Sequence, residues 1–72
     1  SIMKLKDAIE GQEYIIQQIE TDDNDLNAFL FSLGCYSGEA ITIISHLKDS
    51  YVVAIKDARY NIDVQLADAI VV

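Results

Sequence analysis

The clearest pattern along the chain is an alternation of apolar with polar or small residues in residues 39–47 and 51–56. A period of two is typical of strands with one buried face. If the two segments pair as a hairpin around residues 48–50, the register places five large side chains on one face: Ile41, Ile43, Tyr51, Val53 and Ile55. His46 is then expected on the opposite, outward face, where a lone histidine is most often a surface side chain.

Residues 13–20 also predict a strand, but the alternation fails toward its end. Tyr14 and Ile16 share a face, whereas Ile19 falls on the other one. A β-bulge at residues 17–18 would return Ile19 to the inward face, and such bulges are common at the rims of barrels. This strand is therefore expected to bend.

The remaining elements are short. Residues 5–12 carry apolar residues at helical spacing ahead of Gly11, which predicts one or two turns. The C-terminal third predicts a strand, a single helical turn and a closing strand, in this order: residues 58–62 with Tyr60 and Ile62 inward, residues 63–69, and residues 70–72. The pattern as a whole gives five short strands.

The strongest helical pattern lies in residues 21–34, where apolar residues occupy positions i, i+3, i+4 and i+7: Leu26, Phe29, Leu30 and Leu33. Asp22 or Asp23 can cap this helix, and acids in its first turn face the positive end of the helix dipole. The run of aspartates also suggests a calcium loop. The EF-hand pattern needs a central glycine and a closing glutamate, and this segment has neither, so a helix cap is the better interpretation.

Gly34 follows the last apolar position of this helix, where a residue in the left-handed conformation often ends a helix. Cys35 then takes the position whose side chain packs back on the last turn, near Leu30. Two roles are open for this cysteine: a reactive thiol on a turn, or a small apolar side chain in the core. No basic residue is adjacent in sequence to lower the pKa of the thiol, which favours the structural role. Gly38 is expected to form a second turn.

These elements predict a single domain over residues 1–72, mainly β, with one α-helix inserted between the first two strands. Five short strands with one inserted helix describe a small SH3-like five-stranded barrel better than a sandwich or a bundle, because closure protects the strand edges. SH3 domains that bind proline-rich peptides need an aromatic-lined groove, and the chain has no tryptophan. Recognition of that kind is therefore disfavoured.

Charge restricts the partners. Twelve acids against five lysines and arginines give a formal net charge of −7, so the chain is repelled by phosphate backbones and by anionic lipids. Nucleic acid binding is thus disfavoured. The acids are expected to form a solubilising surface, with attraction to a basic protein partner as the alternative. No apolar run approaches the roughly 20 residues that span a bilayer, and a single cysteine suits a reducing compartment, so a soluble, cytoplasmic domain is expected.

Residues with catalytic or metal-binding chemistry are few. The chain has no glycine-rich phosphate loop with lysine, no cysteine and histidine at a recognisable spacing, and no Ser/His/Asp motif. His46, Cys35 and the aspartates before the helix have no spacing that brings them together as metal ligands. The sequence therefore predicts no catalytic residue, no cofactor and no metal ligand.

Three stretches carry a resemblance to a known family: MKLKDAIEGQEYIIQQI with Ile16 and Ile19, LNAFLFSLGCYSGEAITII with Leu26, Leu30, Leu33, Gly34 and Gly38, and LADAIVV with Ala67 and Ile70. Over nearly its whole length the chain resembles bacterial FeoA, a family of small accessory proteins of ferrous iron uptake. It also resembles the C-terminal domain of iron-dependent repressors of the diphtheria toxin repressor type. Phe29, Ser37 and Asp57 stand where the FeoA family usually has arginine, proline and glycine.

The resemblance implies a non-enzymatic cytoplasmic partner of the FeoB membrane transporter, which it would contact at the cytoplasmic GTP-binding portion. The alternative is a regulatory domain of a transcriptional repressor, or a domain that itself senses a transition metal ion. A repressor needs a basic helix-turn-helix segment, which this chain lacks. Met3, followed directly by the family's opening motif, favours a stand-alone protein.

A surface for such a partner is expected where apolar side chains do not belong to the inward faces of the predicted elements. Phe31 lies off the apolar stripe of the helix, and Ile44, Val52 and Ala54 fall on the outward face of the hairpin. Scattered exposed apolar residues are normal, and coverage by the helix or the N-terminal turn is the alternative explanation. The functional hypothesis is a partly apolar patch rimmed by acids, made of Phe31, Tyr36, Ile44 and Val52.

Overall fold

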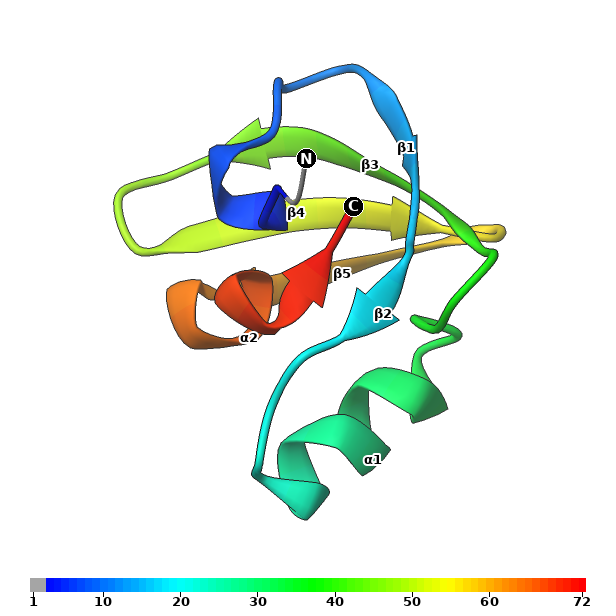
Figure 1. Cartoon of the computed structure of the whole chain (residues 1–72). Helices are drawn as coiled ribbons and strands as arrows, with labels where there is room; N and C mark the ends of the chain where they lie inside the picture. The colour runs from blue at the N-terminus through cyan, green and yellow to red at the C-terminus, as the bar shows by residue number, and fades with distance from the viewer. Residues whose placement is uncertain (1–2) are drawn as a thin grey trace.

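The computed structural model describes residues 3–72, so the first two residues of the predicted domain lie outside the described part. The elements along these residues are η1 (Leu5–Asp7), β1 (Glu13–Ile15), β2 (Gln18–Ile19), α1 (Asn24–Ser32), β3 (Ala40–His46), β4 (Ser50–Ile55), β5 (Ala58–Asp63), α2 (Val64–Ala69) and β6 (Ile70–Val71). A four-stranded antiparallel sheet has the order β1-β3-β4-β5, and β2 pairs with β6 in a second sheet. Figure 1 shows α1 at the lower end of the molecule, with the other elements above it. The prediction of a mainly β domain is confirmed.

The hairpin of β3 and β4 supplies much of the buried core. Ile41 pairs with Ile55 and Ile43 pairs with Val53, and all four side chains are at most 1% exposed. Burial of one such side chain contributes about 1.5–3 kcal/mol relative to exposure, so the alternation of the sequence fixes which face of the sheet turns inward. Tyr51 extends this face toward β5, as the period of two predicts.

The segment predicted as one strand over residues 13–20 is in fact two strands. The N–H of Ile16 donates to the carbonyl of Glu39 at 2.8 Å, and the N–H of the next residue, Gln17, donates to the carbonyl of Val71 at 2.7 Å. The chain therefore leaves one sheet and enters the other between these two residues, where a bulge within one ladder was expected. The change of partner turns Ile19 toward the core, and the described residues hold six strands instead of the expected five.

A β-bulge occurs in β3, where Ile44 is an extra residue between the pairs that β3 makes with β4. An extra residue reverses the alternation of faces beyond it. His46 consequently lies opposite Tyr51, and the two rings stack with their centroids 4.1 Å apart. The prediction that His46 points to the outward face is therefore wrong, although its side chain is exposed.

The N-terminus of α1 is capped by Asp23. One carboxylate oxygen of Asp23 accepts hydrogen bonds from the backbone N–H groups of Asp25 and Leu26, at 2.9 and 3.1 Å. A cap of this kind contributes about 1 kcal/mol, because it satisfies donors that have no partner inside the helix. Of the two aspartates that the sequence offers, the second is the capping residue.

Fewer side chains of α1 face the core than the spacing of its apolar residues predicts. Leu30 is fully buried, and Leu26 and Leu33 pack against the core while partly exposed. Phe29 occupies the remaining position of the predicted stripe, yet 49% of its surface is exposed. The prediction of an inward Phe29 is wrong, because α1 contacts the rest of the domain along one line of leucines only.

The C-terminus of α1 forms a Schellman motif at Gly34, whose φ is +90°. The N–H of Gly34 donates to the carbonyl of Phe31, and the N–H of Cys35 donates to the carbonyl of Leu30, both at 3.0 Å. These two hydrogen bonds define the motif. Cys35 and Leu30 are both fully buried in the same core cluster, and burial raises the pKa of the Cys35 thiol to about 12.

The two ends of the described chain lie side by side. The N–H of Val72 donates to the carbonyl of Met3 at 2.8 Å, and Lys4 forms an antiparallel bridge with Val71. This pairing holds η1 next to β6. Asp63 caps α2 by accepting a hydrogen bond from the N–H of Leu66 at 2.8 Å, so the turn before β6 is also fixed.

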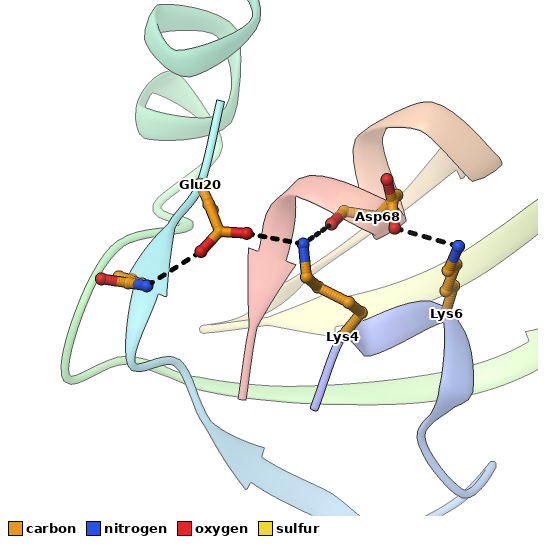
Figure 2. A network of polar contacts seen from close by, with 5 residues as sticks. Lys4, Lys6, Glu20 and Asp68 are labelled. Carbon is orange, nitrogen blue, oxygen red and sulfur yellow. Dashed lines mark hydrogen bonds and ion pairs between the residues drawn. The ribbon is translucent and has the colours of Figure 1, made fainter. Parts of the chain in front are cut away.

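Two lysines near the N-terminus form ion pairs that hold the two ends of the described chain together, as Figure 2 shows. The Nζ of Lys4 lies 2.9 Å from a carboxylate oxygen of Glu20 and donates to the backbone carbonyl of Asp68 at 3.2 Å. The Nζ of Lys6 lies 3.0 Å from the Asp68 carboxylate, and this hydrogen bond lowers the pKa of Asp68 and raises the pKa of Lys6. The residues around η1 are thereby joined to both β2 and α2.

Replacing Gly34 by valine is expected to lower the free energy of unfolding by about 1–3 kcal/mol, because a β-branched residue is strained at positive φ. Gly38→Val is the matched control. Gly38 has a similar φ of +93°, but a Cβ there would meet no atom within 4 Å, whereas a Cβ at Gly34 would lie 2.9 Å from Cε of Lys56. Thermal unfolding should show a fall of about 4–8 °C per kcal/mol, larger for Gly34→Val. An unchanged midpoint for Gly34→Val would contradict the left-handed helix end.

Cys35 is expected to react slowly with a thiol reagent in the folded protein and rapidly in denaturant. The raised pKa keeps the thiol protonated, and full burial blocks access to the sulfur. Raising the pH from 7 to 9 should accelerate the reaction of the denatured chain far more than that of the folded one, because only the unfolded thiol ionises in that range. Equal rates in the folded and denatured protein would show that Cys35 is accessible.

Candidate protein-interaction surface

Two aromatic side chains, one exposed and one half-buried, lie together at the C-terminal end of α1. Phe31 is 65% exposed, and its ring centroid lies 5.1 Å from that of Tyr36, with the ring planes at 38°. Phe31 belongs to the last turn of α1, and Tyr36 follows the Schellman motif. The helix end thus brings together two residues of the predicted patch, and we call them the aromatic pair.

Lys56 fixes the position of Tyr36. Its Nζ lies 5.3 Å from the centroid of the Tyr36 ring and 2.9 Å from a carboxylate oxygen of Glu39. The hydrogen bond to Glu39, and next the contact with Tyr36, raise the pKa of Lys56. A cation over an aromatic ring adds about 0.5–1 kcal/mol at an exposed site. The turn between β4 and β5 is thereby attached to the segment that joins α1 to β3.

Lys56 adopts an unusual backbone conformation to reach this position. Its φ is +55°, and no other non-glycine residue in residues 3–72 has a positive φ. A non-glycine residue in this region costs about 1–3 kcal/mol and persists only where its surroundings hold it. The side chain also passes close to Gly34, where an added Cβ would lie 2.9 Å from Cε of Lys56. The glycine therefore leaves room for the lysine as well as ending the helix.

Ile44 and Val52, the other two residues of the predicted patch, lie in the β3–β4 hairpin. Ile44 is the extra residue of the bulge, next to Ser45, which pairs with Val52. Both Ile44 and Val52 are partly buried, like Tyr36 and unlike Phe31. Ile44 and Val52 are neighbours across the hairpin, near the turn that joins β3 to β4. The aromatic pair lies beside the other end of β4, where Lys56 contacts Tyr36. The structure therefore presents the four residues as two separate pairs.

Two features of this surface were not predicted from the sequence. Phe29 is exposed although it has the spacing of an inward residue, and Lys56 contacts Tyr36 although the two are far apart in the chain. The resemblance drawn from the sequence implies an arginine at position 29, and this departure could have drawn attention to Phe29. Nothing in the sequence pattern indicates the Lys56 contact, because it depends on how the turn after β4 meets the loop after α1.

Charge is distributed unevenly around the surface. Lys4, Lys6 and Lys56 are each held in an ion pair with a carboxylate. Residues 21–32 contain three aspartates and no lysine or arginine. Among the described residues these aspartates form no ion pair: Asp22, Asp23 and Asp25. The helix that carries Phe31 is therefore negatively charged at its start and carries no positive side chain.

The described residues offer little for other kinds of site. Within residues 3–72 no three histidine, cysteine, aspartate or glutamate side chains are grouped so that they could hold a metal ion. The helices of this part of the chain are also too short and too polar to cross a bilayer. The aromatic pair, in which Phe31 is exposed, is the candidate binding feature of this surface.

Comparison with protein families identifies one match, in which residues 3–72 correspond to the FeoA domain. A crystal structure of an iron uptake regulatory protein, FeoA, has a TM-score of 0.85 and 21% sequence identity, and covers 99% of this chain and 95% of that chain. A structure of Stenotrophomonas maltophilia FeoA complexed with zinc, described as a procaryotic SH3 domain protein, has a TM-score of 0.85 and 14% identity. It covers 94% of this chain and 86% of that chain.

The same fold occurs inside a larger protein. A manganese-dependent transcriptional repressor has a TM-score of 0.87 and 19% identity, and the match covers 99% of this chain but 40% of that chain. No curated protein sequence gives a significant match. At these identities the structural matches establish a shared fold.

Proposed function

The chain belongs to the FeoA family, and on that basis we propose that it is a non-enzymatic accessory protein of bacterial ferrous iron uptake that binds the FeoB transporter from the cytoplasm. Membership of the family implies involvement in ferrous iron transport. The observation that carries the proposal is the family match over residues 3–72.

We also interpret the two sheets as the two parts of an SH3-like barrel, with α1 inserted between β2 and β3. The description of the Stenotrophomonas FeoA as an SH3 domain protein supports this interpretation. The change of partner between Ile16 and Gln17 supports it too, because one continuous segment then contributes to both sheets. Such a small closed fold has little interior for a substrate, which is consistent with an accessory role.

In this proposal the aromatic pair is the main anchor for the transporter, and Ile44 and Val52 form a second contact. Exposed aromatic side chains are enriched among the residues that dominate binding energy at protein interfaces. Phe31 is held in place by α1, and Tyr36 by Lys56, so little side-chain freedom is lost when a partner covers them. Ile44 and Val52 are partly buried already and would contribute less new buried area than the exposed Phe31.

The second candidate function is that of a regulatory or metal-sensing domain in an iron-dependent repressor. The observation in its favour is the TM-score of 0.87 to part of the manganese-dependent repressor. Under this alternative the chain would bind a divalent metal, or associate with a DNA-binding protein. The two functions therefore differ in what the purified chain binds.

Phe31→Ser is expected to weaken capture of full-length FeoB from detergent-solubilised membranes by about tenfold, which is the effect of losing an interface anchor worth about 1.4 kcal/mol. The matched control is Ile9→Ser, because Ile9 and Phe31 are 64% and 65% exposed. Both variants should keep the melting temperature of the unmodified chain, since exposed substitutions usually change stability by about 0.5 kcal/mol or less. Loss of stability with capture intact would show that Phe31 is structural.

Ile44→Ser tests the second contact. Because Ile44 is partly buried in a bulge, we expect a small fall in melting temperature together with weaker capture of FeoB. The two effects separate in binding measurements made well below the melting temperature, where the folded fraction is complete. Unchanged capture by the folded variant would restrict the interface to the aromatic pair.

Titration calorimetry with Mn²⁺ and Fe²⁺ distinguishes the two candidate functions. The accessory role predicts no saturable heat at micromolar metal, because the described residues contain no cluster of three metal-ligand side chains. Saturable binding at that concentration, accompanied by failure to capture FeoB, would favour the metal-sensing alternative.

A further inference from the structure

α1 is attached to the rest of the domain along one side only. Leu30 is fully buried, Leu26 is partly buried, and the other residues of Asn24–Ser32 are exposed. Figure 1 shows the helix projecting at the lower end of the molecule. Most of the circumference of this helix is therefore available to a partner.

The exposed circumference has a specific arrangement of side chains. Successive residues of an α-helix are rotated by about 100°, so Phe29 and Phe31 point in directions about 160° apart. Ala28 precedes Leu30 by two residues and therefore projects on the side opposite to it, between the two phenylalanines. The outer face of α1 thus carries Ala28 with a large exposed aromatic residue on either flank, and the polar residues Asn24, Asp25 and Ser32 lie above and below Ala28 on the same face.

A flat partner surface could reach one of these phenylalanines, but a concave surface could reach both. We propose that α1 inserts into a groove of the partner, with Phe29 and Phe31 against two apolar walls and Ala28 facing its floor. This inference rests on the proposed function, in which the partner is FeoB, and it names the geometry of the contact. A small residue at the floor allows the close approach that a narrow groove requires.

The charge of α1 indicates the chemistry of the groove. Residues 21–32 carry three aspartates without a lysine or arginine, and these acids take part in no ion pair among the described residues. A groove with lysine or arginine at the rim near the start of α1 would complement this charge and accelerate association. A lipid surface does not fit, because anionic headgroups would repel the same aspartates.

The decisive variant is Ala28→Tyr, which removes no exposed contact but fills the space between helix and groove floor. With full-length FeoB in detergent micelles, we expect this change to weaken binding by more than about tenfold, which corresponds to about 1.4 kcal/mol. Asn61→Tyr is the matched control, because it places the same side chain at an exposed position of β5. Melting temperatures of both variants should equal that of the unmodified chain.

Single variants test the two walls separately. Phe29→Ser and Phe31→Ser should each weaken binding by about fivefold or more, since both side chains are buried in a groove. If Ala28→Tyr and Phe29→Ser bind as tightly as the unmodified chain while Phe31→Ser is weakened, one flank of α1 makes the contact. The groove is then refuted, and the proposed function stands. If the unmodified chain fails to bind FeoB, the proposed function and this inference fall together.

The contribution of the aspartates near α1 is tested by comparing two double variants. Asp22→Asn with Asp25→Asn should slow association with FeoB, whereas Glu10→Gln with Glu13→Gln removes the same charge away from α1 and should have little effect. Asp23 is left unchanged because it caps the helix. Equal effects of the two double variants would show that only the overall charge matters and would overturn the basic rim. Binding of the chain to phosphatidylglycerol vesicles would overturn the choice of a protein partner.

Discussion

The ending of α1 at Gly34 is the constraint on which much of this structure depends. The left-handed glycine turns the chain back so that Cys35 enters the core against Leu30, which attaches the helix to the sheets. The same glycine lacks the Cβ that would collide with Lys56, and Lys56 in turn holds Tyr36 beside Phe31. One backbone conformation therefore links the core, the orientation of the helix and the aromatic pair.

The β framework could be predicted from the sequence because its driving force is local. Ile41, Val53 and Ile55 alternate with polar or small residues, and burial of large aliphatic side chains leaves one choice of face. The sequence predictions are wrong where a single backbone irregularity changes which residues of a strand face inward. An extra residue at Ile44 moves His46 to the face of Tyr51, and a change of sheet after Ile16 replaces the expected bulge. Periodicity cannot locate such points, since the same residues fit either arrangement until their partners are known.

The candidate surface was predictable only in part, for a related reason. Phe31 lies off the apolar stripe of its helix under any packing, so its exposure follows from helical geometry alone. Phe29 depends on how wide a face of α1 the domain covers, which is a property of the tertiary contacts. The position of Tyr36 depends on Lys56, which lies in the turn between β4 and β5. Lysine has no preference for a positive φ, so the residue type does not reveal the backbone conformation of Lys56.

The adjacent ends of the described chain have a consequence for how this fold can be joined to other proteins. Met3 and Val72 are hydrogen bonded to each other, and the network of Lys4 and Lys6 in Figure 2 holds this region together. A linker at either end would therefore depart from the same place, while α1 lies at the lower end of the molecule in Figure 1. Fusion at one end would leave the helix uncovered, which makes the fold a convenient module to append, as in the repressor where it accounts for 40% of the chain.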